Sequence, residues 1–87
     1  MQQIVFKPRW KEELEAVSEE GKLIFEFTMG IEHVYFPDEN RWKNCVPIWA
    51  KGKWKDYLEG CQNWCNQNRV PISIVPDAHV YEEKSAG

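Results

Sequence analysis

The segment from Lys53 to Asn68 carries apolar side chains at a spacing that only a helix gathers on one face. The other face of this segment is polar or charged, so the sequence predicts an amphipathic helix that covers an apolar surface. We expect Gly60, inside the segment, to mark a point of close packing, because a glycine there weakens the helix. The apolar stripe consists of Trp54, Tyr57, Leu58, Cys61, Trp64 and Cys65.

Several shorter segments have the character of strands. Lys22 to Met29 alternates apolar and polar side chains, which is typical of a strand with one buried face. Ile31 to Phe36 follows Gly30 and is predicted to be its antiparallel partner. Further strands are expected at 41–46, where the alternation is weak, and at 70–75 and 78–82.

A first helix is predicted from Pro8 to Glu20. Proline is favoured in the first turn of a helix, and Gly21 stands where a glycine commonly ends one. Trp10, Leu14 and Val17 fall on one face of such a helix.

The predicted fold is therefore a small two-layer α+β domain, in the order α-β-β-(β)-α-β-β. Two helices are expected to cover an antiparallel sheet. Residues 1–82 form the single domain, and residues 83–87 are expected to be a flexible C-terminal tail.

The composition suits one small domain and argues against disorder, since 43% of the 87 residues are hydrophobic. No apolar run approaches the roughly 20 residues that span a bilayer, and no signal-peptide pattern opens the chain. The three cysteines are an odd number, which suits free thiols in a reducing compartment. We therefore expect a cytoplasmic protein without a membrane partner.

Cys61 and Cys65 lie one turn apart on the predicted helix. Together with His33 and His79 they could supply four zinc ligands, but the chain has no tight metal-binding knuckle. Both thiols also fall inside the apolar stripe, which favours core packing. Thiol redox chemistry is a third interpretation. The sequence predicts no metal site and no cofactor.

Catalytic motifs are absent from the sequence. The serines, at positions 18, 73 and 85, lie in no nucleophile elbow, and no glycine-rich phosphate loop is present. A role for His33 or His79 needs a partner group that a sequence alone does not reveal. We therefore expect a protein that is not an enzyme.

Five tryptophans are many for a chain of this size. The two predicted helices take up Trp10, Trp54 and Trp64, which leaves Trp42 and Trp49 for the surface. Both lie in the segment 41–55, which has five basic side chains and no acidic one, whereas the remaining 72 residues carry six basic and fourteen acidic side chains. Tryptophans and cations together are typical of binding surfaces.

Two interpretations of this segment remain open: a binding surface, or a face that is solvated or paired within the fold. As a binding surface, it is predicted to dock an acidic surface of another protein. Trp42 and Trp49 would be the apolar anchors, and the cations would steer and rim the contact: Arg41, Lys43, Lys51, Lys53 and Lys55. The alternative partner is single-stranded nucleic acid, although the net charge of −3 disfavours it.

Overall fold

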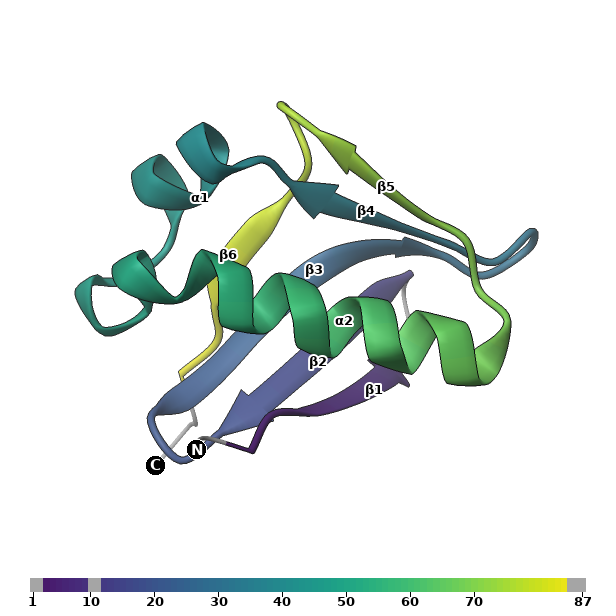
Figure 1. Ribbon diagram of the computed structural model, residues 1–87, viewed down its shortest axis with the longest axis horizontal. Coiled ribbons are helices and arrows are strands. Elements are labelled where there is room, and N and C mark those ends of the chain that lie inside the picture. The colour runs from purple at the N-terminus through teal and green to yellow at the C-terminus, as the bar shows by residue number, and fades with distance from the viewer. Residues whose placement is uncertain (1–2, 10–11, 85–87) are drawn as a thin grey trace.

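The computed structural model describes residues 3–9 and 12–84 (Figure 1). The described residues form a small α+β domain with a six-stranded, mostly antiparallel sheet. The elements in chain order are β1 (Val5–Arg9), β2 (Glu13–Ser18), β3 (Gly21–Thr28), β4 (His33–Pro37), α1 (Glu39–Cys45), the 3-10 helix η1 (Ile48–Lys53), α2 (Trp54–Asn68), β5 (Ile72–Val75) and β6 (Val80–Glu82).

Strand β3 organises the sheet. Along one side it pairs antiparallel with β2, which in turn pairs with β1. Along its other side, the first half of β3 pairs with β6 and the second half with β4. Strand β5 then pairs with β4 in parallel, so the sheet order is β1-β2-β3-β4-β5 with β6 beside β3. The chain between β4 and β5 consists of α1, η1 and α2.

The prediction of a first helix at 8–20 is wrong, because these residues contribute to the hairpin of β1 and β2. Leu14 and Ala16 are fully buried, while Glu13 and Glu15 lie on the opposite face. The burial of the side chains therefore alternates with every residue, as in a strand. Gly21 starts β3 instead of ending a helix. The prediction for Trp10 lies outside the described residues.

The strand predicted at 41–46 is also wrong, because α1 occupies this position. The carboxylate of Asp38 accepts a hydrogen bond from the backbone N–H of Arg41 at 2.8 Å, and this cap starts the helix.

The remaining elements are confirmed. The predicted hairpin of 22–29 and 31–36 is β3 and β4, and the long helix is α2, with the predicted stripe facing the sheet. The expected strands at 70–75 and 78–82 are β5 and β6. Gly60 does mark a close contact, since a Cβ there would lie 2.9 Å from Cε1 of Phe6.

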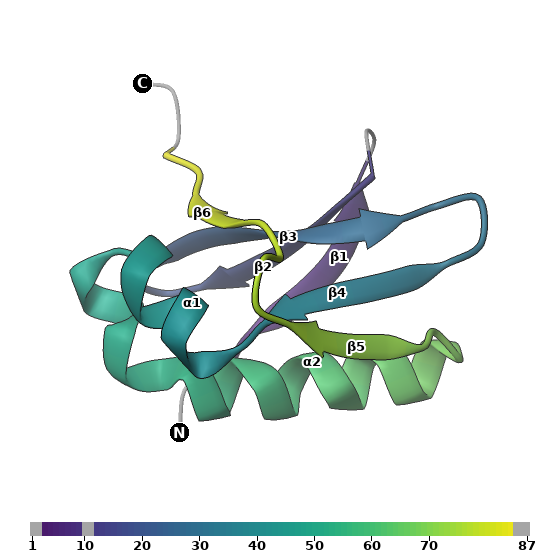
Figure 2. The same cartoon turned by 90° about the horizontal axis from the view of Figure 1, so that it is seen from above.

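The molecule has two layers, as the second view shows (Figure 2). Helix α2 runs across one face of the sheet, and α1 and η1 continue this layer at one end. The hydrophobic core lies between the layers and includes Phe25 and Phe27 of β3 and Phe36 of β4. The opposite face of the sheet has no helix over it in the described part of the chain.

Glu83, which had been assigned to a flexible tail, is tied to the sheet. Its backbone N–H donates to the carbonyl of Lys22 at 2.9 Å, and its carboxylate pairs with Arg9. Residues 85–87 lie outside the described residues.

Trp42 of α1 is fully buried in this core. Its rings stack on Phe25 and Phe36, with centroids 6.1 and 5.9 Å apart, and contact Tyr57 of α2 at 5.3 Å. The indole N–H donates to the carbonyl of Ala50 at 2.8 Å. A single side chain thereby joins the sheet, α2, α1 and η1.

The substitution Trp42→Phe should lower the free energy of unfolding by about 1–3 kcal/mol, because it leaves the buried Ala50 carbonyl without its donor and opens a small cavity. Urea denaturation monitored by circular dichroism measures this change. Trp64→Phe is the matched control, since the Trp64 ring is only partly buried against the core. An equal or larger loss from Trp64→Phe would contradict the central role of Trp42.

Candidate partner-binding surface

The basic segment 41–55 forms one end of the molecule. It contains most of α1, all of η1 and the start of α2, and these three elements lie together in both views (Figures 1 and 2). Pro47 precedes η1 and has an extended backbone, so it separates α1 from η1. The structure therefore brings the segment together as a single projecting surface.

The burial of Trp42 corrects the expectation that it anchors a partner at the surface. None of its side chain is exposed, and its indole N–H is already bonded within the fold. The physical reason is that 41–45 is helical: the face of α1 that carries Trp42 turns toward the sheet.

Trp49 is half-buried and fastens η1 to the sheet. Its indole N–H donates to Oε2 of Glu82 in β6 at 3.1 Å. Its ring also lies against Gly21 at the start of β3, where a Cβ would stand 2.6 Å from Cζ2 of the indole. These contacts assign Trp49 to holding the projecting end in place.

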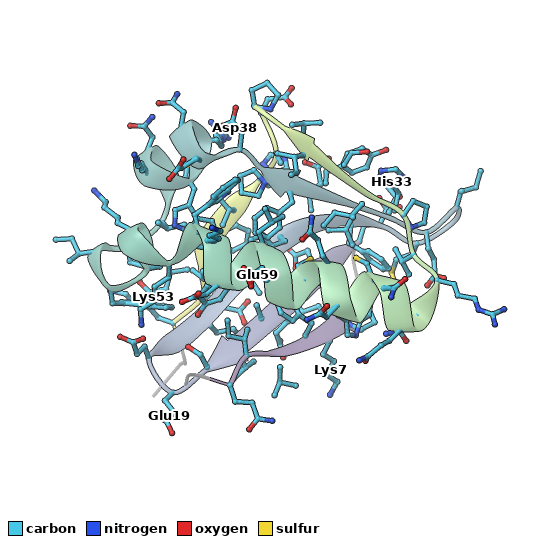
Figure 3. The ribbon with its side chains drawn as sticks, viewed as in Figure 1. Lys7, Glu19, His33, Asp38, Lys53 and Glu59 are labelled. Carbon is cyan, nitrogen blue, oxygen red and sulfur yellow. The ribbon has the colours of Figure 1, made fainter. Side chains whose placement is uncertain are left out.

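Two of the expected rim cations are engaged within the fold. The guanidinium Nε of Arg41 donates to the carbonyl of Ala78 at 3.1 Å. The ammonium of Lys53 pairs with the carboxylate of Glu20, on the side of the molecule where Figure 3 labels Lys53. These contacts bind α1 to the chain before β6, and η1 to the turn before β3.

The other three cations point away from the fold. Lys43, Lys51 and Lys55 are exposed, and none of them has an ion pair to any residue in 3–9 or 12–84. Their charge is therefore available to a partner, unlike that of Lys53.

Sequence reasoning missed Ile48, whose side chain is 87% exposed at the start of η1. A 3-10 helix has three residues per turn, so Ile48 and Lys51 lie on the same side of η1. We call the surface formed by Lys43, Ile48, Lys51 and Lys55 the basic end. The one available signal was an isoleucine after Pro47, at the middle of a segment with no acid.

A group of acidic side chains lies on the face of the sheet that α2 leaves uncovered. Arg9 donates to Glu13 at 3.1 Å, to Glu15 at 3.3 Å and to Glu83 at 2.6 Å. These bonds raise the pKa of the Arg9 guanidinium and lower the pKa of the Glu83 carboxyl. Lys22 lies 3.6 Å from both Glu15 and Glu83 and completes the network.

This network borders a hollow of about 440 Å³ on the same face, between β2, β3 and β6. The hydroxyl of Tyr81 donates to the carboxylate of Glu13, and this bond raises the pKa of Tyr81 to about 12. Glu26, another residue of the wall, accepts a hydrogen bond from the backbone N–H of His79. The carboxylates of Glu13 and Glu26 are therefore engaged within the fold.

The histidines do not meet. His33, labelled in Figure 3, lies on β4, where its Nε2 is 2.7 Å from Oγ of Ser73 and its ring stacks on Tyr35. Among the described residues, no carboxylate is hydrogen-bonded to the His33 ring to orient it as a base.

The cysteines pack in the core. All three are free thiols; Cys61 and Cys65 are buried, and Cys45 is partly exposed. Burial and a hydrogen bond to Cys65 raise the pKa of the Cys61 thiol. Within 3–9 and 12–84, no group of three or more His, Cys, Asp or Glu side chains is placed to hold a metal ion.

Comparison with protein-family models, with curated proteins and with solved structures finds no match to this chain. In the described part of the chain, no helix has the length and apolar character needed to cross a membrane.

The substitution Gly21→Ala should lower the free energy of unfolding by about 1–3 kcal/mol, because the new methyl group overlaps the Trp49 ring and pushes η1 from the sheet. Gly30→Ala is the matched control, since no atom lies within 4 Å of a Cβ there. Chemical denaturation of the two variants measures the difference. Equal stabilities would show that η1 is not held against Gly21.

Thiol labelling should separate the cysteines. In the native protein we expect only Cys45 to react readily with a disulfide reagent, and Cys61 and Cys65 to react after denaturant is added, because the reagent does not reach buried thiols. The variant Cys45→Ser should then show almost no fast reaction. Rapid labelling of two thiols in that variant would restore the redox interpretation.

Proposed function

We propose that this chain is a non-enzymatic protein-binding module, which docks an acidic surface of another protein through the basic end. The observation that carries the proposal is Ile48, an isoleucine that is 87% exposed. It lies in a segment whose exposed lysines have no ion pair in the described residues. An exposed apolar residue in a segment with uncompensated cations suits an anchor with a charged rim.

The distribution of charge supports a partner outside the chain. Arg9 and Lys22, two of the cations on the uncovered face of the sheet, are engaged in internal ion pairs. The lysines of the basic end are not. Positive charge held at one projecting end accelerates the encounter with an acidic surface and orients it.

The proposal modifies the expectation from sequence. Ile48 takes the role of apolar anchor that had been assigned to Trp42 and Trp49, and Lys43, Lys51 and Lys55 form the rim. Trp49 contributes by fixing η1. The three free cysteines suit a reducing compartment, so we place the protein in the cytoplasm.

Capture experiments with tagged protein and nuclease-treated lysate test this function. A partner recovered by the native chain should be lost with Ile48→Asp, and an acidic partner should bind about 10- to 100-fold more weakly, as expected for the loss of an apolar anchor. The triple variant Lys43→Gln, Lys51→Gln, Lys55→Gln should mainly slow association, and most strongly at low salt.

Ile31→Asp is the matched control, because Ile31 is 89% exposed in the turn between β3 and β4, at the opposite end of the molecule. It should bind as the native chain does. Equal loss from Ile31→Asp and Ile48→Asp would contradict the proposed surface. Recovery that disappears with nuclease treatment, together with salt-sensitive binding of a labelled single-stranded oligonucleotide, would instead assign the basic end to nucleic acid.

A further inference from the structure

Strand β5 is an edge of the sheet, and it lies at the outside of the molecule in both views (Figures 1 and 2). Its sequence is Ile72-Ser73-Ile74-Val75, and no charged residue occurs from Val70 to Pro76. Proteins usually protect an edge strand with charges or proline, because its free backbone groups otherwise pair with another strand. The opposite edge, β1, follows this rule with Lys7, Pro8 and Arg9.

The backbone of β5 presents a defined set of free groups. The carbonyls of Pro71 and Val75 accept hydrogen bonds from residues 34 and 38, at 2.9 and 3.2 Å. Backbone groups of successive residues in a strand point to opposite sides, so residues 71, 73 and 75 face β4. The N–H and C=O groups of Ile72 and Ile74 therefore point to the open edge.

We propose that two copies of this chain associate through β5, as an antiparallel pair with a two-fold axis at Ser73. This register places Ile72 opposite Ile74 of the partner subunit, and the reverse. Each such pair exchanges two hydrogen bonds, so all four free groups on each edge are satisfied. The two sheets become one continuous sheet across the interface.

Neighbouring registers are disfavoured because they require a backbone N–H that is missing or already bonded. An axis at Ile74 would place Pro76 opposite Ile72, and proline has no N–H to donate to the Ile72 carbonyl. An axis at Ile72 would place Val70 opposite Ile74, but the Val70 N–H already donates to the carbonyl of Cys65 at 2.8 Å. Pro71 removes no intermolecular hydrogen bond in the proposed register, because its nitrogen faces β4.

The side chains agree with the same register. Ile72 and Ile74 are paired in β4 with the core residues Val34 and Phe36, so they lie on the face that α2 covers. Ile74 is 47% exposed in the single chain, and the pairing covers it with Ile72 of the partner subunit. Because β5 carries no charge, the two-fold axis brings no like charges together.

The interface is small, because each copy contributes one short strand. Stable interfaces usually bury about 1,200–2,000 Å² in total, so the dimer should be weak, with a dissociation constant between about 1 μM and 1 mM. The proposed pairing uses no residue of the basic end, so this inference does not depend on the proposed function.

Sedimentation velocity over a series of concentrations up to about 1 mM tests the proposal. The native chain should sediment faster as concentration rises, whereas Ile74→Pro should remain monomeric. The Ile74 N–H points to the open edge, so proline there removes an intermolecular bond and leaves the pairing with β4 intact. Ile74→Lys should also remain monomeric, because it places lysines beside the axis. Val5→Lys, on the exposed edge strand β1, is the matched control and should dimerise normally.

Amide hydrogen exchange measured by NMR gives a second readout on the unmodified protein. Exchange of the Ile72 and Ile74 amides should slow about 10-fold or more as the concentration rises well above the dissociation constant, while other exposed amides keep their rates. A native chain that stays monomeric at about 1 mM overturns the proposal. So does a dimer that persists in Ile74→Pro and Ile74→Lys, or one that leaves these two amides unprotected.

Discussion

The position of the Trp42 indole determines how the helical layer meets the sheet. It is stacked on Phe25 and Phe36 and is bonded to the carbonyl of Ala50. These contacts fix α1 and η1 relative to β3 and β4, although neither helix is long enough to be stable alone. The stability of the projecting end is therefore tertiary in origin. If the indole left the core, Trp49 and Lys53 would still hold η1 to β6 and to the turn before β3, but α1 would lose its stacking on the sheet.

The sequence was sufficient to predict the elements whose periodicity is unambiguous. The apolar stripe of α2 fits only the periodicity of a helix, and the alternation in β3 fits only that of a strand. Both predictions are confirmed. The segment 8–20 fitted two templates, since Leu14 and Val17 suit a helix while Leu14 and Ala16 suit a strand. Pro8 and Gly21 resembled helix boundaries and biased the prediction. Pairing with β3 stabilises the strand rather than the helix. This pairing cannot be read from the local sequence of the segment.

The candidate site was predictable as a segment but not as a set of exposed side chains. Its charge and boundaries are visible in the sequence. Which tryptophan is buried, however, depends on the cap that Asp38 provides, because the helix that starts there turns Trp42 inward. Ile48 was missed since a single isoleucine after proline belongs to no periodic pattern. Exposure is a property of the assembled fold, and Ile48 can be recognised only once η1 has been placed.

Both proposed surfaces follow from one topological feature, the parallel pairing of β4 and β5. Parallel neighbours cannot be joined by a tight turn, so the chain must leave the sheet and cross back over it. Here the crossover consists of α1, η1 and α2, and its outer turn is the basic end. The crossover leads into β5, which is an edge strand. Among the described residues no later strand pairs with its open side, because β6 pairs with β3. The covered face is thus completed by the same crossover that exposes the basic end and leaves the edge of β5 open.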